Sequence, residues 1–141
     1  MSSLLDTNIL SELRKGPRCN AAVARWSDAQ DPGAFHISVL ALGEIRRGVE
    51  RLRPRDGSQA KVLDGWLEQV RATFAGRILP VDEAVADLWG RFDPSRPFPV
   101  IDALMAATAR VHGLVLVTRN VADVRATGTE VFNPFDDPPH Q

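Results

Sequence analysis

Hydrophobic and polar residues follow one another in short blocks along the whole chain, and these blocks predict alternating strands and helices. Apolar runs with the length of strands occur at residues 2–5, 34–37, 78–81, 114–117 and 130–132. Between them, apolar residues recur every three to four positions, which is typical of amphipathic helices. This alternation is the pattern of a parallel sheet covered on both faces. It predicts one α/β domain with about five strands between layers of helices.

The helical spacing predicts helices at residues 7–13, 18–29, 39–49, 63–74, 83–92 and 100–112. Polar residues mark several helix ends. Ser38 and Asp82 stand where an N-cap belongs, and Gly113 stands where a helix ends in a left-handed turn. The run at 114–117 is apolar throughout, so both its faces should be buried in a parallel sheet. The predicted domain covers residues 1–135, and residues 136–141 form a short tail.

Length and composition match an ordinary globular domain. The chain has 141 residues, of which 44% are hydrophobic and 25% charged. It lacks the roughly 18 consecutive apolar residues of a membrane span, and its first residues do not resemble a signal peptide. Cys19 is the single cysteine, so no disulfide can form within the chain. We expect a soluble, cytoplasmic protein.

The charge balance is nearly neutral, yet its positive part is almost all arginine. The net charge is -1, and only Lys15 and Lys61 are lysines among 17 basic residues. The planar guanidinium group suits bidentate contacts with phosphate, although codon bias in a GC-rich genome explains the same excess. The charge therefore permits a nucleic-acid substrate without requiring one.

Four acids occupy comparable places along the predicted fold. Asp6 ends the first strand, and Glu44 lies in the second turn of the helix after the second strand. Asp102 lies in the first turn of the helix at 100–112, and Asp123 follows the strand at 114–117. The carboxyl ends of parallel strands meet at one edge of a sheet, where α/β proteins bind ligands. Carboxylates gathered there repel one another without a cation, so the pattern indicates a divalent metal and phosphate chemistry.

Four short segments together resemble the PIN-domain ribonucleases, and among them the VapC-type toxins of type II toxin–antitoxin modules. The segments are Leu5-Asp6-Thr7-Asn8, Gly43-Glu44-Ile45, Asp102-Ala103 and Thr118-Arg119-Asn120 with Asp123, and Asn133-Pro134 follows them. The resemblance extends over about residues 3–135. It implies a PIN-like domain that binds one or two Mg²⁺ or Mn²⁺ ions and cleaves single-stranded RNA. It also implies a homodimer, and an antitoxin whose C-terminal segment covers the acidic pocket and which alone contacts operator DNA.

Each acid can be given an expected role. Asp6 is the central metal ligand, and Asp102 and Asp123 complete the metal shell. Glu44 binds the metal or orients the attacking water. Hard divalent cations prefer such oxygen ligands, and the sequence has no His/Cys cluster for zinc. The side chains expected to orient these carboxylates are Thr7, Asn8, Ser38, Thr118 and Asn120.

Simpler roles exist for several of these residues. Any of the acids can favour a helix N-terminus without a metal, and Thr7, Asn8 and Ser38 can be helix caps. Asp93 and Asp136 are alternatives to Asp123 at the same edge of the sheet.

Arginines are concentrated just after Glu44, at positions 46, 47, 51, 53 and 55. We expect Arg46, Arg47 and Arg119 to bind the RNA backbone, since phosphate contacts give affinity without sequence information. The alternative is a solvated helix face paired with Glu50.

Two other functions are compatible with an acid after the first strand. An aspartate-nucleophile phosphatase needs a second Asp two residues after Asp6, where Asn8 stands, and a lysine at a late strand end. A catalytically inactive PIN-like module that binds RNA or protein needs none of the four acids.

The clustering of the four acids further predicts that, without metal, at least one of the carboxylates has a raised pKa.

Overall fold

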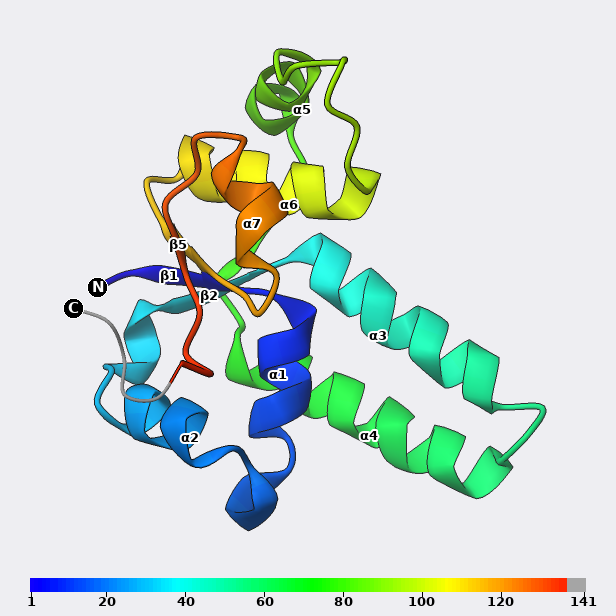
Figure 1. Cartoon of the computed structure of the whole chain (residues 1–141). Helices are drawn as coiled ribbons and strands as arrows, with labels where there is room; N and C mark the ends of the chain where they lie inside the picture. Colours follow the sequence, from blue (N-terminus) through cyan, green and yellow to red (C-terminus); the bar gives the residue numbers. More distant parts are fainter. Residues whose placement is uncertain (137–141) are drawn as a thin grey trace.

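A five-stranded parallel sheet forms the centre of the computed structural model, which describes residues 1–136 (Figure 1). The strand order is β3-β2-β1-β4-β5. The strands are β1 (Ser3–Leu5), β2 (Phe35–Ser38), β3 (Ile78–Leu79), β4 (Val115–Val117) and β5 (Val131–Phe132). Leu4 of β1 is paired with His36 on one side and with Leu116 on the other. The predicted α/β class and its parallel sheet are confirmed.

Seven α-helices surround the sheet within residues 1–136. They are α1 (Thr7–Leu13), α2 (Ala21–Asp28), α3 (Val39–Leu52), α4 (Gly57–Thr73), α5 (Glu83–Gly90), α6 (Val100–Val111) and α7 (Val121–Arg125). Within residues 1–136, none of these helices is both long and apolar enough to cross a membrane. Apart from Asp136, the predicted tail lies outside the described residues.

Most helix ends follow the predicted caps. The Ser38 hydroxyl accepts a hydrogen bond from the Leu40 amide (3.0 Å), and Asp82 caps α5 in the same way. The helix predicted at 18–29 was placed too early. It begins at Ala21, because the Asn20 side chain accepts hydrogen bonds from two amides of the first turn. The preceding segment, Gly16–Arg18, is a short 3₁₀ helix.

The side chains of the strands alternate between two hydrophobic clusters. Leu5 and Val117 belong to a large cluster with residues of α1, α3 and α4. Leu4 and Leu116 belong to a second cluster with residues of α6 and α7. Successive residues of a strand point to opposite faces of the sheet, so both faces of β1 and β4 are buried. This agrees with the apolar runs in the sequence.

The strand order creates a crevice at one edge of the sheet. From β1 the chain continues to β2 and β3 on one side, while β4 and β5 lie on the other. The carboxyl ends of β1 and β4 are therefore the point at which the order of the strands reverses. Ligands of open α/β sheets bind at this kind of position.

Candidate active site

Asp6 is held in one orientation by donors from both sides of the crevice. Its Oδ1 accepts a hydrogen bond from the Thr7 amide (2.7 Å). Its Oδ2 accepts one from the Thr118 hydroxyl (2.7 Å) and one from the Asn8 side chain (3.2 Å). A carboxylate oxygen has two lone pairs, so Oδ2 is saturated while Oδ1 keeps one lone pair. Asp6 can thus offer one oxygen to a cation in a fixed direction.

Thr118 and Asn8 connect the loops that follow β1 and β4. Thr118 is fully buried at the end of β4, and its hydroxyl accepts a hydrogen bond from the Asn120 amide (3.1 Å) as well as donating to Asp6. The Asn8 side chain accepts a bond from the Arg119 amide (3.3 Å). These neutral contacts fix the backbone around Asp6 without adding charge.

Glu44 reaches the same place from α3. Its Oε1 accepts a hydrogen bond from the Thr7 hydroxyl (2.6 Å), so Thr7 binds Asp6 through its amide and Glu44 through its side chain. Burial raises the pKa of Glu44, and the charges of Asp6 and Asp102 raise it further against the effect of the Thr7 hydrogen bond. The carboxylate is therefore a stronger base than an exposed glutamate.

Asp102 and Asp123 complete the group of acids. Asp102 is half-buried in the first turn of α6, and its pKa is raised by burial first and then by the charges of Asp6 and Asp123. Asp123 lies exposed on α7. The charges of Asp6 and Asp102 act on Glu44, and those of Asp6 and Asp123 act on Asp102. The raised pKa that the sequence predicted for at least one of the acids is confirmed at Glu44 and Asp102.

The other predicted residues have different positions. Ser38 contacts the Leu40 amide as a helix cap, and the Asn120 backbone rather than its side chain contacts Thr118. Asp93 accepts hydrogen bonds from Ser95 within the proline-rich loop, and it is not among the charges that raise the pKa of Asp102. Asp136 lines a neighbouring cavity instead.

The donor set suits a hard cation held partly by water. In the described part of the chain, no three His, Cys, Asp or Glu side chains are grouped closely enough to coordinate one ion by themselves. Mg²⁺ is usually bound by one or two carboxylates, with water and substrate phosphate as its remaining ligands. The oriented Oδ1 of Asp6 and the nearby Glu44 and Asp102 fit that requirement.

Two of the five arginines after Glu44 form ion pairs within the described residues. Arg46 forms ion pairs with Asp64 (3.0 Å) and Glu50 (3.4 Å), and Arg53 also pairs with Glu50. The alternative of a paired helix face therefore describes Arg46 and Arg53. Arg47 is exposed, and no ion pair is recorded for it within residues 1–136.

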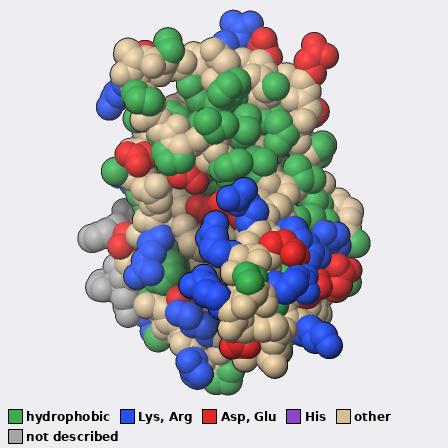
Figure 2. Space-filling model, turned by 90° about the vertical axis from the view of Figure 1, so that its right-hand side faces the viewer, with side chains coloured by type: hydrophobic (Ala, Val, Ile, Leu, Met, Phe, Trp, Pro, Cys, Tyr) green, Lys and Arg blue, Asp and Glu red, His purple; other side chains and the backbone are tan. Residues whose placement is uncertain are grey.

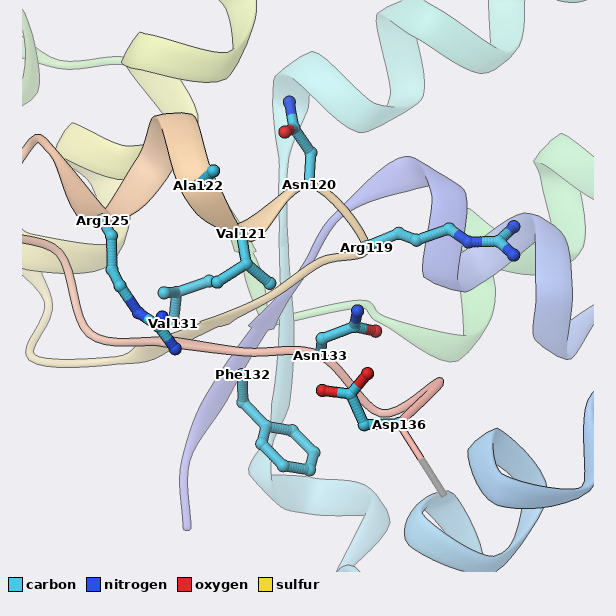
Figure 3. Close-up of a pocket in the computed structure, with 9 residues that line it drawn as sticks. All are labelled: Arg119, Asn120, Val121, Ala122, Arg125, Val131, Phe132, Asn133 and Asp136. Atoms are coloured by element: carbon cyan, nitrogen blue, oxygen red, sulfur yellow. The ribbon is translucent and has the colours of Figure 1, made fainter. Parts of the chain in front are cut away.

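A cavity of about 650 Å³ lies between α7 and β5, and its lining begins at Arg119, directly after Thr118 (Figure 3). It is lined by Arg119, Asn120, Val121, Ala122, Arg125, Val131, Phe132, Asn133 and Asp136. The sequence analysis did not single out Arg125, because α7 has only five residues and shows no apolar periodicity.

The surface around the site divides into two zones. Figure 2 shows hydrophobic side chains gathered over the upper half of one face, above a band of acidic and basic side chains. Trp89, Val100 and Ile101, from α5 and the start of α6, are exposed over 41%, 56% and 36% of their surface. Large contiguous apolar patches are uncommon on the surfaces of monomeric proteins.

Three comparisons relate the chain to known proteins. A family model described as PIN domain matches residues 3–125. The chain is 36% identical over 140 residues to the toxin FitB of Neisseria gonorrhoeae, covering 95% of this chain and 99% of that protein. It is 32% identical over 139 residues to the VapC ribonuclease Y4jK of Sinorhizobium fredii, covering 94% and 97%. The solved structure of FitAB bound to an IR36 DNA fragment matches with a TM-score of 0.83 and 34% identity, over 94% of this chain and 95% of that chain.

Proposed function

The chain belongs to the PIN-domain family, with close relatives named as VapC ribonucleases and toxin FitB, and from this we propose a Mg²⁺- or Mn²⁺-dependent endoribonuclease. It would cleave single-stranded RNA as the toxin of a toxin–antitoxin pair. The observation that carries the proposal is the convergence of Asp6, Glu44, Asp102 and Asp123 at the carboxyl edge of the sheet, with Asp6 held by three hydrogen-bond donors.

The chemistry divides between the metal and the protein side chains. A bound divalent ion would polarise the scissile phosphate and favour ionisation of the attacking water. Asp6 would hold the ion through Oδ1, with Asp102 and Asp123 contributing directly or through water. Glu44 has a raised pKa and a fixed orientation, so it would accept the proton of the attacking water. The leaving oxygen then receives a proton from solvent as the phosphodiester bond breaks.

We further propose two protein partners. One relative is named as a toxin, and the similar solved structure of FitAB is bound to a DNA fragment, which supports a cognate antitoxin for this chain and contact with operator DNA through it. An acidic pocket favours a basic segment of that antitoxin as its cover. The exposed apolar zone of Trp89, Val100 and Ile101 supports a homodimer.

The phosphatase alternative is disfavoured by the position of Asn8. Its amide nitrogen donates to Asp6, where an acid would be required. Of the two lysines, Lys15 pairs with Glu12 (2.9 Å) and Lys61 lies on α4, so neither follows a late strand.

Cleavage of labelled single-stranded RNA by the purified protein, with Mg²⁺, Mn²⁺ or EDTA, tests the proposal. We expect metal-dependent cleavage that is lost in Asp6→Asn. Asp56→Asn is the matched control, because Asp56 caps α4 and an asparagine can make the same cap. Equal cleavage by Asp6→Asn and wild type would reject the metal-nuclease mechanism. Failure of the wild type with either metal would favour the inactive binding module.

A further inference from the structure

The cavity between α7 and β5 begins at the loop that orients Asp6. Thr118, which binds Asp6, is followed in the chain by Arg119 and Asn120, and these two residues already line the cavity. The next five residues form α7, which carries both Asp123 and the cavity residue Arg125. Thr118 contacts both Asp6 and the cavity residue Asn120, so the cavity and the acids share this loop.

The wall of the cavity contains arginine, apolar and asparagine side chains. Figure 3 shows Arg125 extending from α7 toward β5 beside Val131, with Asn133 and Asp136 further along the same strand end. Two arginines and one aspartate give this wall a net charge of +1, in contrast to the four carboxylates next to it.

Three side chains of this wall are placed to make contacts with a ligand. Arg125 is exposed, and the described residues include no ion-pair partner for it. The Arg119 guanidinium is held 4.2 Å from the centre of the Phe135 ring. Asn133 Oδ1 accepts a hydrogen bond from the Phe135 amide (2.9 Å), which orients the side chain and leaves its NH₂ group as a donor. The cavity thus offers cations, an apolar surface and an oriented amide.

We propose that this cavity binds the nucleotide adjacent to the scissile phosphate, an inference that rests on the proposed function. Arg125 contacts the phosphate of that nucleotide. Val121 and Val131 contact its base, and the Asn133 side chain donates a hydrogen bond to the edge of the base. The volume lies within the range of about 300–1,000 Å³ of small-ligand sites. Proteins recognise single-stranded RNA by such contacts with unstacked bases.

Electrostatics explains why the nucleotide belongs here. A metal ion would offset part of the charge of the four carboxylates, and cations just outside the cluster would add to the attraction for a phosphodiester chain. Of the arginines predicted to do this, Arg46 is occupied by ion pairs. A basic protein segment is the less favourable occupant, because Arg119 and Arg125 would repel it.

Two substitutions test the proposal: one removes a positive charge from the cavity wall, and the other removes a negative charge. Binding of a short, fluorescein-labelled RNA of random sequence is measured by anisotropy with Mg²⁺, in an Asp6→Asn background that blocks cleavage. Arg125→Gln should weaken binding several-fold and reduce the slope of log K against log salt by about 0.7, the value for one lost phosphate contact on a single strand. Asp136→Asn should tighten binding. Arg18→Gln, an exposed arginine beyond the far end of α1, should change neither quantity.

The outcomes separate this inference from the proposed function. With cleavage-competent protein, Arg125→Gln should raise KM and leave kcat within about twofold, as expected when binding alone is lost. If the wild type cleaves RNA but Arg125→Gln and Asp136→Asn behave like Arg18→Gln, the cavity proposal is wrong and the function stands. If these variants alter antitoxin binding and leave RNA binding unchanged, the cavity belongs to the protein partner and the proposal is also wrong. Opposite shifts in RNA binding without cleavage by the wild type would support the cavity and reject the nuclease.

Discussion

Replacing Thr118 by valine should weaken metal binding although Thr118 would not touch the metal. The substitution keeps the shape of the side chain and removes the hydroxyl that donates to Asp6 Oδ2 (2.7 Å) and accepts from the Asn120 amide. Asp6 would keep only the longer Asn8 contact at Oδ2 (3.2 Å) and could rotate. Removing an outer hydrogen bond of this type typically reduces metal affinity about 10- to 100-fold.

The same substitution carries a cost in stability. Thr118 is fully buried, and hydrogen bonds to charged groups contribute about 1.5–3 kcal/mol. Asp6 is only half-buried, so solvent can replace part of the lost bond, and we expect a loss of about 1–2 kcal/mol in the free energy of unfolding. Calorimetric titration with Mn²⁺ gives the affinity, and urea denaturation of the metal-free protein gives the stability.

Thr108→Val separates the two effects. Thr108 is equally buried, but its hydroxyl donates to the Leu104 carbonyl within α6 and has no contact with Asp6. It should leave the Mn²⁺ affinity within about twofold of wild type, because no oriented carboxylate is released. Wild-type Mn²⁺ affinity in Thr118→Val would refute the reasoning that this hydroxyl orients the metal ligand.

Three further results are expected. The raised pKa values of Glu44 and Asp102 mean that the folded state binds protons more tightly than the unfolded state. The free energy of unfolding of the metal-free protein should therefore fall as the pH rises from near 4.5 through the raised pKa of Glu44. Glu44→Gln should flatten this dependence in urea denaturation with EDTA, and an unchanged pH profile would contradict the prediction. Mg²⁺ or Mn²⁺ should raise the melting temperature, and a metal concentration of 100 times Kd should add about 2.7 kcal/mol to the free energy of unfolding. This increase should be smaller in Asp6→Asn. A melting temperature that does not change with either ion would contradict the metal site. Val100→Glu should place a charge in the exposed apolar zone and dissociate a homodimer in analytical ultracentrifugation, whereas an unchanged mass would assign that zone to another partner.

The sequence by itself determined the class of fold and predicted which acids share one edge of the sheet. Apolar periodicity depends on local geometry, so the alternation of strands and helices could be predicted along the chain. Caps such as Ser38 and Asp82 act within one turn of helix and were equally readable. Asp6, Glu44 and Asp102 were predicted to share one site because Asp6 follows a strand, Asp102 begins a helix and Glu44 lies in the second turn of another helix.

Only the tertiary structure decided how these parts interact. The hydrogen bond between Asp6 and Thr118 joins residues 112 positions apart, and the ion pair that occupies Arg46 comes from Asp64 on another helix. The raised pKa of Glu44 depends on burial, which is set by packing. Arg125 and its cavity could not be predicted, because α7 is too short for periodicity and the cavity forms only where it lies against β5. Local patterns fix elements and residue types, whereas distances, burial and charge contacts arise between segments that no local pattern connects.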